Sequence, residues 1–325
     1  MLAFSSNPRR RAAPGHEACS GCSLCLLGCP VWRQRRDIRL TPQGRAKALQ
    51  HGAGSRQIAA SVESCTLCGS CEPACPENIG LMDMILELRR EQPLGRDRVA
   101  AMPGAAIAGT PQQPRQPYIG RTVLIADAPL RAQVARVERV RALLDAAVLA
   151  DDDGADIALA LEAGVPLPPE RQARFLEALS AARRIVVADG GLLRALRGWL
   201  PRSRITGLGE ALSALPALRS RLRSSDLYVI EARAFHYDWR RLLAHYDLLR
   251  ADLGCEMNLD LQRLAVPTTA SSAQHALGLP AIDPAEQARW ILEGRDPRRI
   301  VVEDARDCEV FARLTDRPVL HLADL

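Results

Sequence analysis

The chain has 325 residues, of which 47% are hydrophobic and 25% charged, with a formal net charge of +5. This length suffices for two domains that each bury a core, and the composition excludes disorder over most of the chain. No run of eighteen apolar residues occurs, and the N-terminus lacks the apolar core of an export signal, so neither a transmembrane helix nor export is expected. Because the positive charge is nearly all arginine and lacks interleaved aromatic residues, no nucleic-acid partner is expected.

Eight of the ten cysteines lie in two copies of the pattern Cys-x-x-Cys-x-x-Cys-x-x-x-Cys-Pro. The copies consist of Cys19, Cys22, Cys25 and Cys29, before Pro30, and of Cys65, Cys68, Cys71 and Cys75, before Pro76. Iron in a [4Fe–4S] cluster prefers thiolate ligands, and each cluster has four iron corners to hold. The pattern therefore predicts two [4Fe–4S] clusters. Zinc sites and disulfides are the alternatives, and they suit this spacing and a reducing cytoplasm less well.

Three cysteines spaced three residues apart can wrap three corners of one cluster, while the fourth, before proline, ligates the cluster of the other run. The predicted ligands are Cys19, Cys22, Cys25 and Cys75 for the first cluster, and Cys65, Cys68, Cys71 and Cys29 for the second. Gly21 and Gly69 lie inside the two loops, where the backbone must pass close to inorganic sulfide.

The connection between the runs is predicted to be helical. Thr41 and Pro42 form an N-cap and first-turn pair, a second short helix leads into Cys65, and residues 81–88 form a third helix. We therefore expect an α-helical dicluster ferredoxin domain over residues 1–91. Four arginines that follow the first run indicate either a solvated basic face or a docking surface for an acidic partner. They are Arg33, Arg35, Arg36 and Arg39.

A proline-rich linker is expected over residues 92–118, followed by a duplicated α/β domain with parallel sheet over residues 119–325. The expected strands lie at 122–126, 185–188, 227–230, 300–302 and 319–321, with helices over 191–200, 209–223 and 238–253. Three segments of the first half resemble later ones at offsets of about 104 to 115 residues, which indicates internal duplication. The pairs are 123–127 with 227–231, 185–189 with 300–304, and 208–212 with 320–325.

The stretch from Thr41-Pro42-Gln43-Gly44-Arg45 to Cys75-Pro76, with the α/β texture that follows, resembles the iron–sulfur subunits of glycolate oxidase, lactate-utilisation enzymes, anaerobic glycerol-3-phosphate dehydrogenase and heterodisulfide reductase. In that family each α/β repeat carries a cysteine-rich signature that can bind a further iron–sulfur centre. Here the equivalent positions hold other residues, and only Cys255 and Cys308 remain. The positions equivalent to the signature are Asp152-Asp153-Gly154, Asp189-Gly190-Gly191, Thr268-Thr269-Ala270 and residues 304–308. The resemblance thus implies a retained scaffold that has lost its cluster.

The resemblance also implies an electron-transfer subunit of an oxidoreductase complex, without catalysis of its own. Its partners would be a flavin-containing dehydrogenase and a quinone or other carrier, in the cytoplasm and at the inner face of the membrane only through those partners. A catalytic subunit of heterodisulfide-reductase type, acting through Cys255 or Cys308, and a redox sensor or assembly factor are the alternatives.

Three weaker patterns are less favoured than ordinary structural roles. The first is a metal site built from His236, His245, Cys255 and His275. The second is a cation site at residues 151–153, and the third is a nucleotide-binding turn at residues 190–191 without the full glycine fingerprint.

Overall fold

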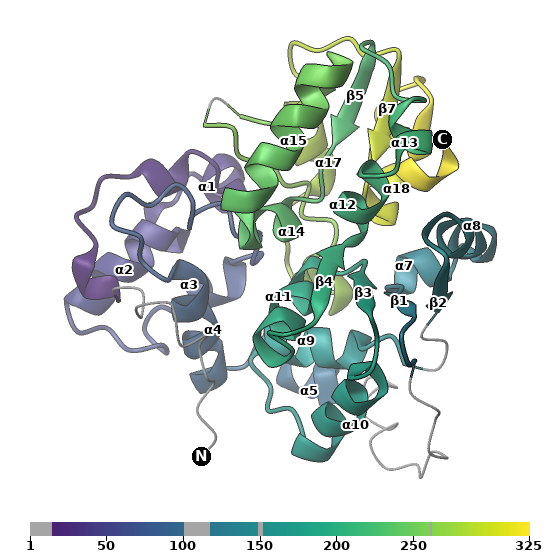
Figure 1. The fold of residues 1–325 in the computed structure, drawn as a ribbon. Coiled ribbons are helices and arrows are strands. Elements are labelled where there is room, and N and C mark those ends of the chain that lie inside the picture. Colours follow the sequence, from purple (N-terminus) through teal and green to yellow (C-terminus); the bar gives the residue numbers. More distant parts are fainter. Residues whose placement is uncertain (1–14, 101–117, 149–151, 261) are drawn as a thin grey trace.

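The computed structural model describes residues 15–100, 118–148, 152–260 and 262–325 (Figure 1). Its N-terminal region, drawn in purple and blue, consists of short helices and loops, and the remainder contains two parallel four-stranded sheets. The predicted fold class is therefore confirmed as a helical N-terminal region followed by α/β structure. Most of the proline-rich segment, residues 101–117, lies outside the described residues.

Prolines and a polar cap start the first two α-helices of the N-terminal region. Pro30 and Pro42 occupy first-turn positions, where a missing N–H costs nothing, and Thr41 Oγ1 accepts a hydrogen bond from the Gly44 N–H at 3.1 Å. The predicted cap at Thr41 is thus confirmed. The elements of this region are η1 (His16–Ala18), η2 (Leu24–Leu26), α1 (Pro30–Arg35), η3 (Ile38–Leu40), α2 (Pro42–Gln50), α3 (Ala59–Ser64), α4 (Leu81–Glu91) and α5 (Arg96–Ala100).

The first α/β half contains a sheet with the strand order β2-β1-β3-β4. Its apolar strands are buried on both faces, as parallel strands covered by helices must be. The elements are β1 (Thr122–Ile125), α7 (Ala128–Arg131), α8 (Val134–Leu144), β2 (Ala146–Val148), α9 (Ala155–Ala163), α10 (Pro169–Leu179), β3 (Arg184–Val187), α11 (Gly190–Trp199), β4 (Arg204–Gly207), α12 (Leu208–Ser213) and α13 (Pro216–Arg219).

The second half repeats this arrangement, because its strands follow the order β6-β5-β7-β8. Each strand thus has a counterpart four strands later at the same place in its sheet, which supports the predicted internal duplication. The elements are β5 (Asp226–Val229), α14 (Ala232–Tyr237), α15 (Trp239–Leu253), β6 (Glu256–Met257), α16 (Ala273–Ala276), α17 (Pro284–Leu292), β7 (Arg299–Val302), α18 (Ala305–Ala312), β8 (Val319–His321) and η4 (Leu322–Asp324).

One apolar core joins the two sheets. Alternate residues on each strand point to opposite faces, so Leu124 and Val186 of the first sheet face the same core as Tyr228 and Val301 of the second. Helices α8, α12 and α15 complete that shared core. Helices α9, α10 and α11 cover the opposite face of the first sheet, whereas α17 and α18 cover that of the second. The two halves therefore form one packed unit.

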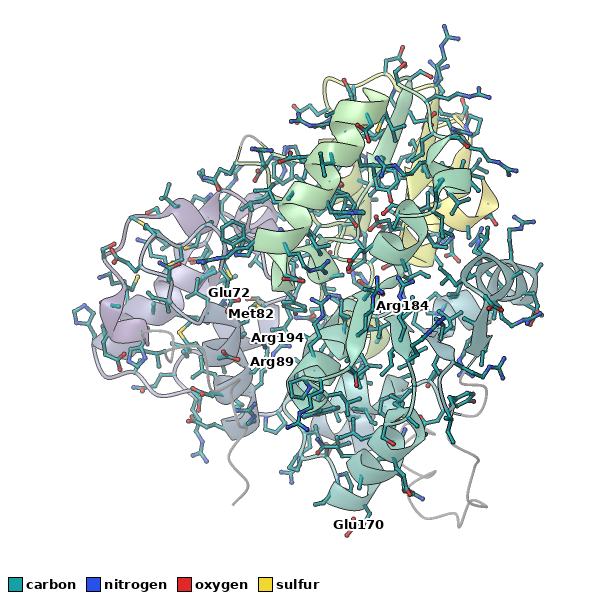
Figure 2. The ribbon with its side chains drawn as sticks, in the orientation of Figure 1. Glu72, Met82, Arg89, Glu170, Arg184 and Arg194 are labelled. Atoms are coloured by element: carbon teal, nitrogen blue, oxygen red, sulfur yellow. The ribbon has the colours of Figure 1, made fainter. Side chains whose placement is uncertain are left out.

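The N-terminal region packs directly against this unit. Arg194 of α11 forms an ion pair with Asp83 of α4 at 2.6 Å, and the buried Arg89 donates to the Glu162 carbonyl of α9 at 2.7 Å. Figure 2 shows Arg89 and Arg194 where the purple-blue helices meet the teal half. Leu94 and Val99, at the start of the expected linker, are buried against α9 and α16. That part of the expected linker is ordered and helical.

Two sequence-based expectations differ from the structure in the α/β part. The helix expected over 209–223 is two helices, α12 and α13, because Pro216 starts a new helix after a break. The strands β2, β4 and β6 were not predicted, nor were α9 and α10. Within the described residues no helix is both long and apolar enough to cross a bilayer.

Candidate metal centres

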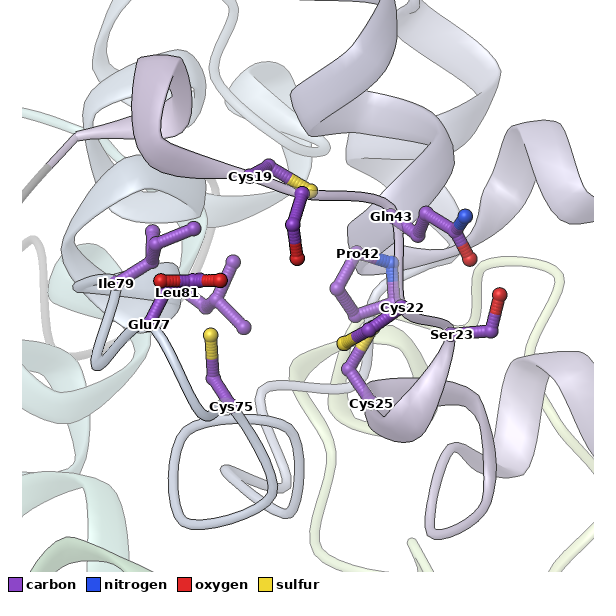
Figure 3. A pocket seen from close by; sticks show the side chains of 11 residues that line it. Cys19, Cys22, Ser23, Cys25, Pro42, Gln43, Cys75, Glu77, Ile79 and Leu81 are labelled. Atoms are coloured by element: carbon purple, nitrogen blue, oxygen red, sulfur yellow. The ribbon is translucent and has the colours of Figure 1, made fainter.

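Four cysteines of the two runs line one cavity in the N-terminal region. They are Cys19, Cys22 and Cys25 from the first loop and Cys75 from the end of the second. Figure 3 shows their sulfur atoms directed into the same space, with Gln43, Ile79 and Leu81 around it. These are the residues predicted to bind the first cluster. Ser20, Ser23 and Glu77 also line the cavity. A cavity into which four thiols point suits a thiolate-ligated iron–sulfur cluster.

Side chains of α2 hold the first loop in shape. Gln43 Nε2 donates to the Gly21 carbonyl at 3.0 Å, and Lys47 Nζ donates to the Cys19 carbonyl at 2.7 Å. Gln50 Nε2 also donates to the Cys19 carbonyl, at 3.0 Å. The loop needs this support because Gly21 and Ser23 both adopt left-handed conformations, with φ of +82° and +68°. Sequence reasoning did not assign Lys47 to the support of this loop. The one feature that sets the residue apart in the sequence is that it is the only lysine of the chain.

The other four cysteines form a second group. Burial raises the pKa of the Cys29 thiol to about 12, and the nearby Cys68 and Cys65 raise it as well. Burial also raises the pKa of Cys71 well above its usual value, with further contributions from Cys68, Cys65 and Cys29. Cys29 therefore lies near the cysteines of the second run, and the neighbouring Gly28 carbonyl accepts a hydrogen bond from the Ser70 hydroxyl of that run at 2.9 Å. A buried thiol of this kind keeps its proton unless a metal takes the proton's place, so the group fits cluster iron as its partner.

The two loops have the same local conformation. Leu67 and Gly69 are left-handed, with φ of +52° and +78°, at the positions that correspond to Gly21 and Ser23. The left-handed pair flanks the second cysteine of each run, Cys22 or Cys68, so the two cysteine loops are equivalent in backbone conformation. A cubane spreads its four ligands over four irons, whereas ligands of one ion gather around a single centre. Among the described residues, no group of three or more His, Cys, Asp and Glu side chains could hold one metal ion.

The place of Gly69 in the sequence predicts a close approach of the backbone to inorganic sulfide. The structure gives another steric reason for this glycine, which is the packing of α14 against it. A Cβ at this position would lie 2.9 Å from the Cβ of His236 and 3.3 Å from Cε1 of Tyr237. The second loop therefore packs against α14. Sequence reasoning did not find His236 and Tyr237 as neighbours of this loop, because about 170 residues separate them from it.

The arginines after the first run do not form one free basic face. The Arg33 guanidinium lies 3.7 Å from the ring centre of Trp290, and it also pairs with Glu293. Arg35 donates to the Ala281 carbonyl at 3.3 Å. Both side chains thus fasten α1 to the second α/β half.

The weaker candidate sites do not assemble. His236 contacts the Cys68 carbonyl, and His245 contacts the Ser213 hydroxyl. His275 contacts the carbonyl of Ile282 within its own loop. Each imidazole therefore has a different partner, and the four-residue metal site considered in the sequence analysis is not formed.

The remaining cysteines lie in different parts of the second half. Cys255 is buried in the core that joins the two sheets, whereas Cys308 lies on α18 against the outer core. Burial raises the pKa of each thiol to about 11. A thiol with so high a pKa is a poor nucleophile at neutral pH. The pair offers neither a cluster site nor an activated dithiol.

The positions compared with the family's cysteine signature carry polar and charged side chains that pair with other side chains. Asp152 forms a two-bond ion pair with Arg171 at 2.7 and 2.8 Å, and Asp153 lies 3.4 Å from Arg131. Residue 151, which belongs to the candidate cation site at residues 151–153, lies outside the described residues. In the second half, the Thr268 hydroxyl donates to Asp307 at 2.6 Å. Protein partners thus satisfy these polar groups.

The Gly190–Gly191 turn is filled by side chains of the chain itself. A Cβ on Gly190 would lie 2.7 Å from Glu231 Oε2, and one on Gly191 would lie 2.7 Å from Glu162 Oε1. Carboxylates this close leave the turn unsuited to a phosphate group, so the structure does not support the nucleotide-binding turn.

The comparisons with known proteins agree with the N-terminal geometry. Residues 15–79 match the family model described as a 4Fe-4S dicluster domain. The chain is similar to a subunit of the ferredoxin:CoB-CoM heterodisulfide reductase of Methanosarcina mazei, with 35% identity over 78 residues. A subunit of the ferredoxin/F(420)H(2)-dependent CoB-CoM heterodisulfide reductase of Methanosarcina acetivorans matches at the same identity and length. Each match covers 22% of this chain and 44% of the relative. No solved structure matches the chain.

Proposed function

Because residues 15–79 belong to the 4Fe-4S dicluster domain family, we propose that the chain is an electron-transfer subunit of a multi-subunit oxidoreductase. It relays single electrons through two [4Fe–4S] clusters, each of which supplies a one-electron redox centre when bound. Residues 1–91 form the redox domain, and residues 119–325 are the α/β platform on which it is mounted. The observation that carries the proposal is the cavity lined by Cys19, Cys22, Cys25 and Cys75, which brings a cysteine of the second run to the first. The electrostatic influence of Cys65 and Cys68 on Cys29 supports the converse arrangement for the second set.

The first set holds one cluster through Cys19, Cys22, Cys25 and Cys75, and the second set holds the other through Cys65, Cys68, Cys71 and Cys29. Because each set borrows a ligand from the other run, the two clusters lie close together within one rigid unit, as electron relay requires. The chain supplies their ligands, their burial and the hydrogen bonds that set their potentials.

The first cluster is the one that exchanges electrons with a partner protein. Cys22 is the exposed cysteine of the eight, and the first set has one buried member, Cys25, where the second has two, Cys29 and Cys71. Leu24 and Leu27, beside Cys25, are also exposed and apolar, as the contact surface of a redox partner would be. Electrons therefore enter or leave at the first cluster, and the second lies deeper against the α/β platform.

The partner is a flavin-containing dehydrogenase, and the second carrier is a quinone or a comparable acceptor. Two features support a complex over a free-standing enzyme. The relatives are named as subunits of heterodisulfide reductases, and the α/β domain offers no activated cysteine to carry out a reduction of its own. A flavoprotein converts two-electron chemistry into the single-electron steps that clusters carry.

Anaerobic purification of the full chain tests the clusters. We expect about eight irons per chain and, after dithionite reduction, an electron paramagnetic resonance spectrum of two interacting [4Fe–4S] centres. Cys68→Ser removes a second-cluster ligand and lowers the iron content toward about four. A wild-type chain with zinc in place of iron, or with about four irons, contradicts the proposal.

A pull-down of the tagged chain from its native cell tests the partner separately. We expect a flavin-containing dehydrogenase to co-purify and to reduce the clusters when its substrate is added. Cys68→Ser then blocks electron transfer to an added quinone, while reduction of a dye by the dehydrogenase itself continues. If the variant passes electrons to the quinone as fast as wild type, the relay is wrong even where both clusters are present.

A further inference from the structure

Helix α14 of the α/β domain carries two side chains onto the second cysteine loop. Nδ1 of His236 lies 2.7 Å from the Cys68 carbonyl, and since a carbonyl only accepts, Nδ1 carries the donated hydrogen. The Tyr237 hydroxyl donates to the Leu67 carbonyl at 2.9 Å. His236 is 1% exposed, so its hydrogen bond is shielded from water.

Helix α16 adds a third contact to the same loop. Nε2 of Gln274 donates to the Cys65 carbonyl at 2.6 Å and to the Glu63 carbonyl at 2.7 Å. Gln274 is 1% exposed. Side chains from two helices of the α/β domain thus bind three carbonyls of the second loop, at residues 65, 67 and 68.

The first loop has equivalent contacts from a different source. The carbonyls of Cys19 and Gly21 correspond in position to those of Cys65 and Leu67. In the first loop they accept from Lys47 and Gln43 of α2, within the N-terminal region itself. Helices α14 and α16 therefore do for the second loop what α2 does for the first.

The second loop needs this outside support for a physical reason. Leu67 is left-handed, a conformation that strains any residue with a side chain, and the neighbouring Gly69 is left-handed as well. Within the N-terminal region, Arg89 donates to the Cys65 carbonyl and the Ser70 hydroxyl donates to Gly28. The strained carbonyl of Leu67 has Tyr237 as its partner.

We propose that Tyr237 and Gln274, together with His236, are positioning residues of the second [4Fe–4S] site, so that the α/β domain completes one cluster site and leaves the other to the N-terminal region. This inference rests on the proposed function, because it assumes that both cysteine groups bind clusters. It gives the α/β domain a role in cluster binding that needs none of the lost cysteines. Outer contacts of this kind orient metal ligands, and their loss commonly weakens metal binding 10- to 100-fold.

The test compares two conservative variants of the full chain with a matched control. Tyr237→Phe removes one hydroxyl and Gln274→Leu removes one amide, while both keep side-chain volume. Gln43→Leu makes the equivalent change at the first loop, where Gln43 binds the Gly21 carbonyl. Iron release to a ferrous chelator is followed over time, and resonance spectra of the reduced protein identify which cluster is lost.

In the wild-type protein, the iron of both clusters should be released slowly to the chelator. With Tyr237→Phe or Gln274→Leu, about half of the iron should leave at least about tenfold faster, and the signal of one cluster should disappear with it. Gln43→Leu should release the other half and remove the other signal. Far-ultraviolet circular dichroism before chelation shows that each variant is folded.

Two outcomes overturn the inference. One is that Tyr237→Phe and Gln274→Leu both release iron at the wild-type rate. The other is that they remove the same signal as Gln43→Leu, which would mean that the α/β domain does not act on a particular cluster. Wild-type protein without clusters would instead refute the proposed function, so the two failures are distinguishable.

Discussion

Replacing Gly164 by alanine tests how closely the N-terminal region packs on the first α/β half. Gly164 ends α9 with φ of +76°. A Cβ there would lie 2.3 Å from both the carbonyl carbon and oxygen of Arg89 in α4, whereas ordinary contact begins at 3.4 Å. Since both atoms belong to backbone, no side chain can rotate away. The two helices must separate by roughly 1 Å to admit the methyl group.

The expected loss of stability has two parts. An alanine held in the left-handed conformation costs about 1–2 kcal/mol, and forcing packed backbone apart costs about 1–3 kcal/mol more. Gly164→Ala should thus lower the free energy of unfolding by about 2–5 kcal/mol. Gly254→Ala is the matched control, because Gly254 ends α15 with φ of +66° and its nearest atom to an added Cβ is 3.6 Å away. That control should lose only about 1–2 kcal/mol.

Urea unfolding of both variants, followed by circular dichroism, measures the difference. We expect the midpoint of Gly164→Ala to lie clearly below that of Gly254→Ala at an unchanged slope. Equal midpoints would show that α4 moves away from α9 without cost, and the close packing of the two regions would then be wrong.

Three further predictions concern buried charges and thiols of the α/β domain. Burial raises the pKa of Glu303 to about 7, so the folded protein keeps a proton that the unfolded chain releases. Stability should therefore fall by up to roughly 3 kcal/mol as pH rises from about 4.5 through 7; Glu303→Gln should flatten that slope in urea titrations, and an unchanged slope would assign it to other groups. Arg233→Met leaves several buried carboxylates unpaired and should cost about 3–5 kcal/mol, whereas the exposed Arg317→Met should cost under about 1 kcal/mol; similar losses would mean that the buried network is weak. Replacing Cys255 and Cys308 together by alanine should leave iron content and electron transfer at wild-type levels, and a lost spectral signal would show that the α/β domain binds a centre of its own.

The features that could be predicted from the sequence are those encoded by nearby residues. The spacing from Cys19 to Cys25 predicted a loop that directs three cysteines to one place, as the shared cavity shows, and Thr41 with Pro42 predicted where α2 begins. Runs such as Ile185–Val187 predicted buried parallel strands, because apolar side chains on both faces need cover on both faces. Repeated strand-helix segments predicted the duplication that the two strand orders support.

The features that were missed depend on residues far apart in the chain. Met257 belongs to β6, a strand of two residues whose partner β5 lies about 30 residues earlier, and so short a run carries no period of its own. In the sequence, His236 stood out only as a member of a weak candidate metal site with His245, Cys255 and His275. Its contact with Cys68 spans 168 residues, and no local pattern signals such a pair. That α2 binds the first cysteine loop and α14 binds the second can be seen only in the three-dimensional structure.

A network of buried charges explains how α14 keeps its place. Glu231 caps that helix, accepting hydrogen bonds from the Arg233 and Ala234 N–H groups. The Arg233 side chain then pairs with Glu162 of α9 and with Asp189, the cap of α11. Because unpairing any of these buried charges is costly, the start of α14 is fixed to both neighbouring helices of the first half. The last turn of that same helix presents Tyr237 to the second cysteine loop. This network of buried charges therefore fixes the helix whose Tyr237 side chain binds the second cysteine loop.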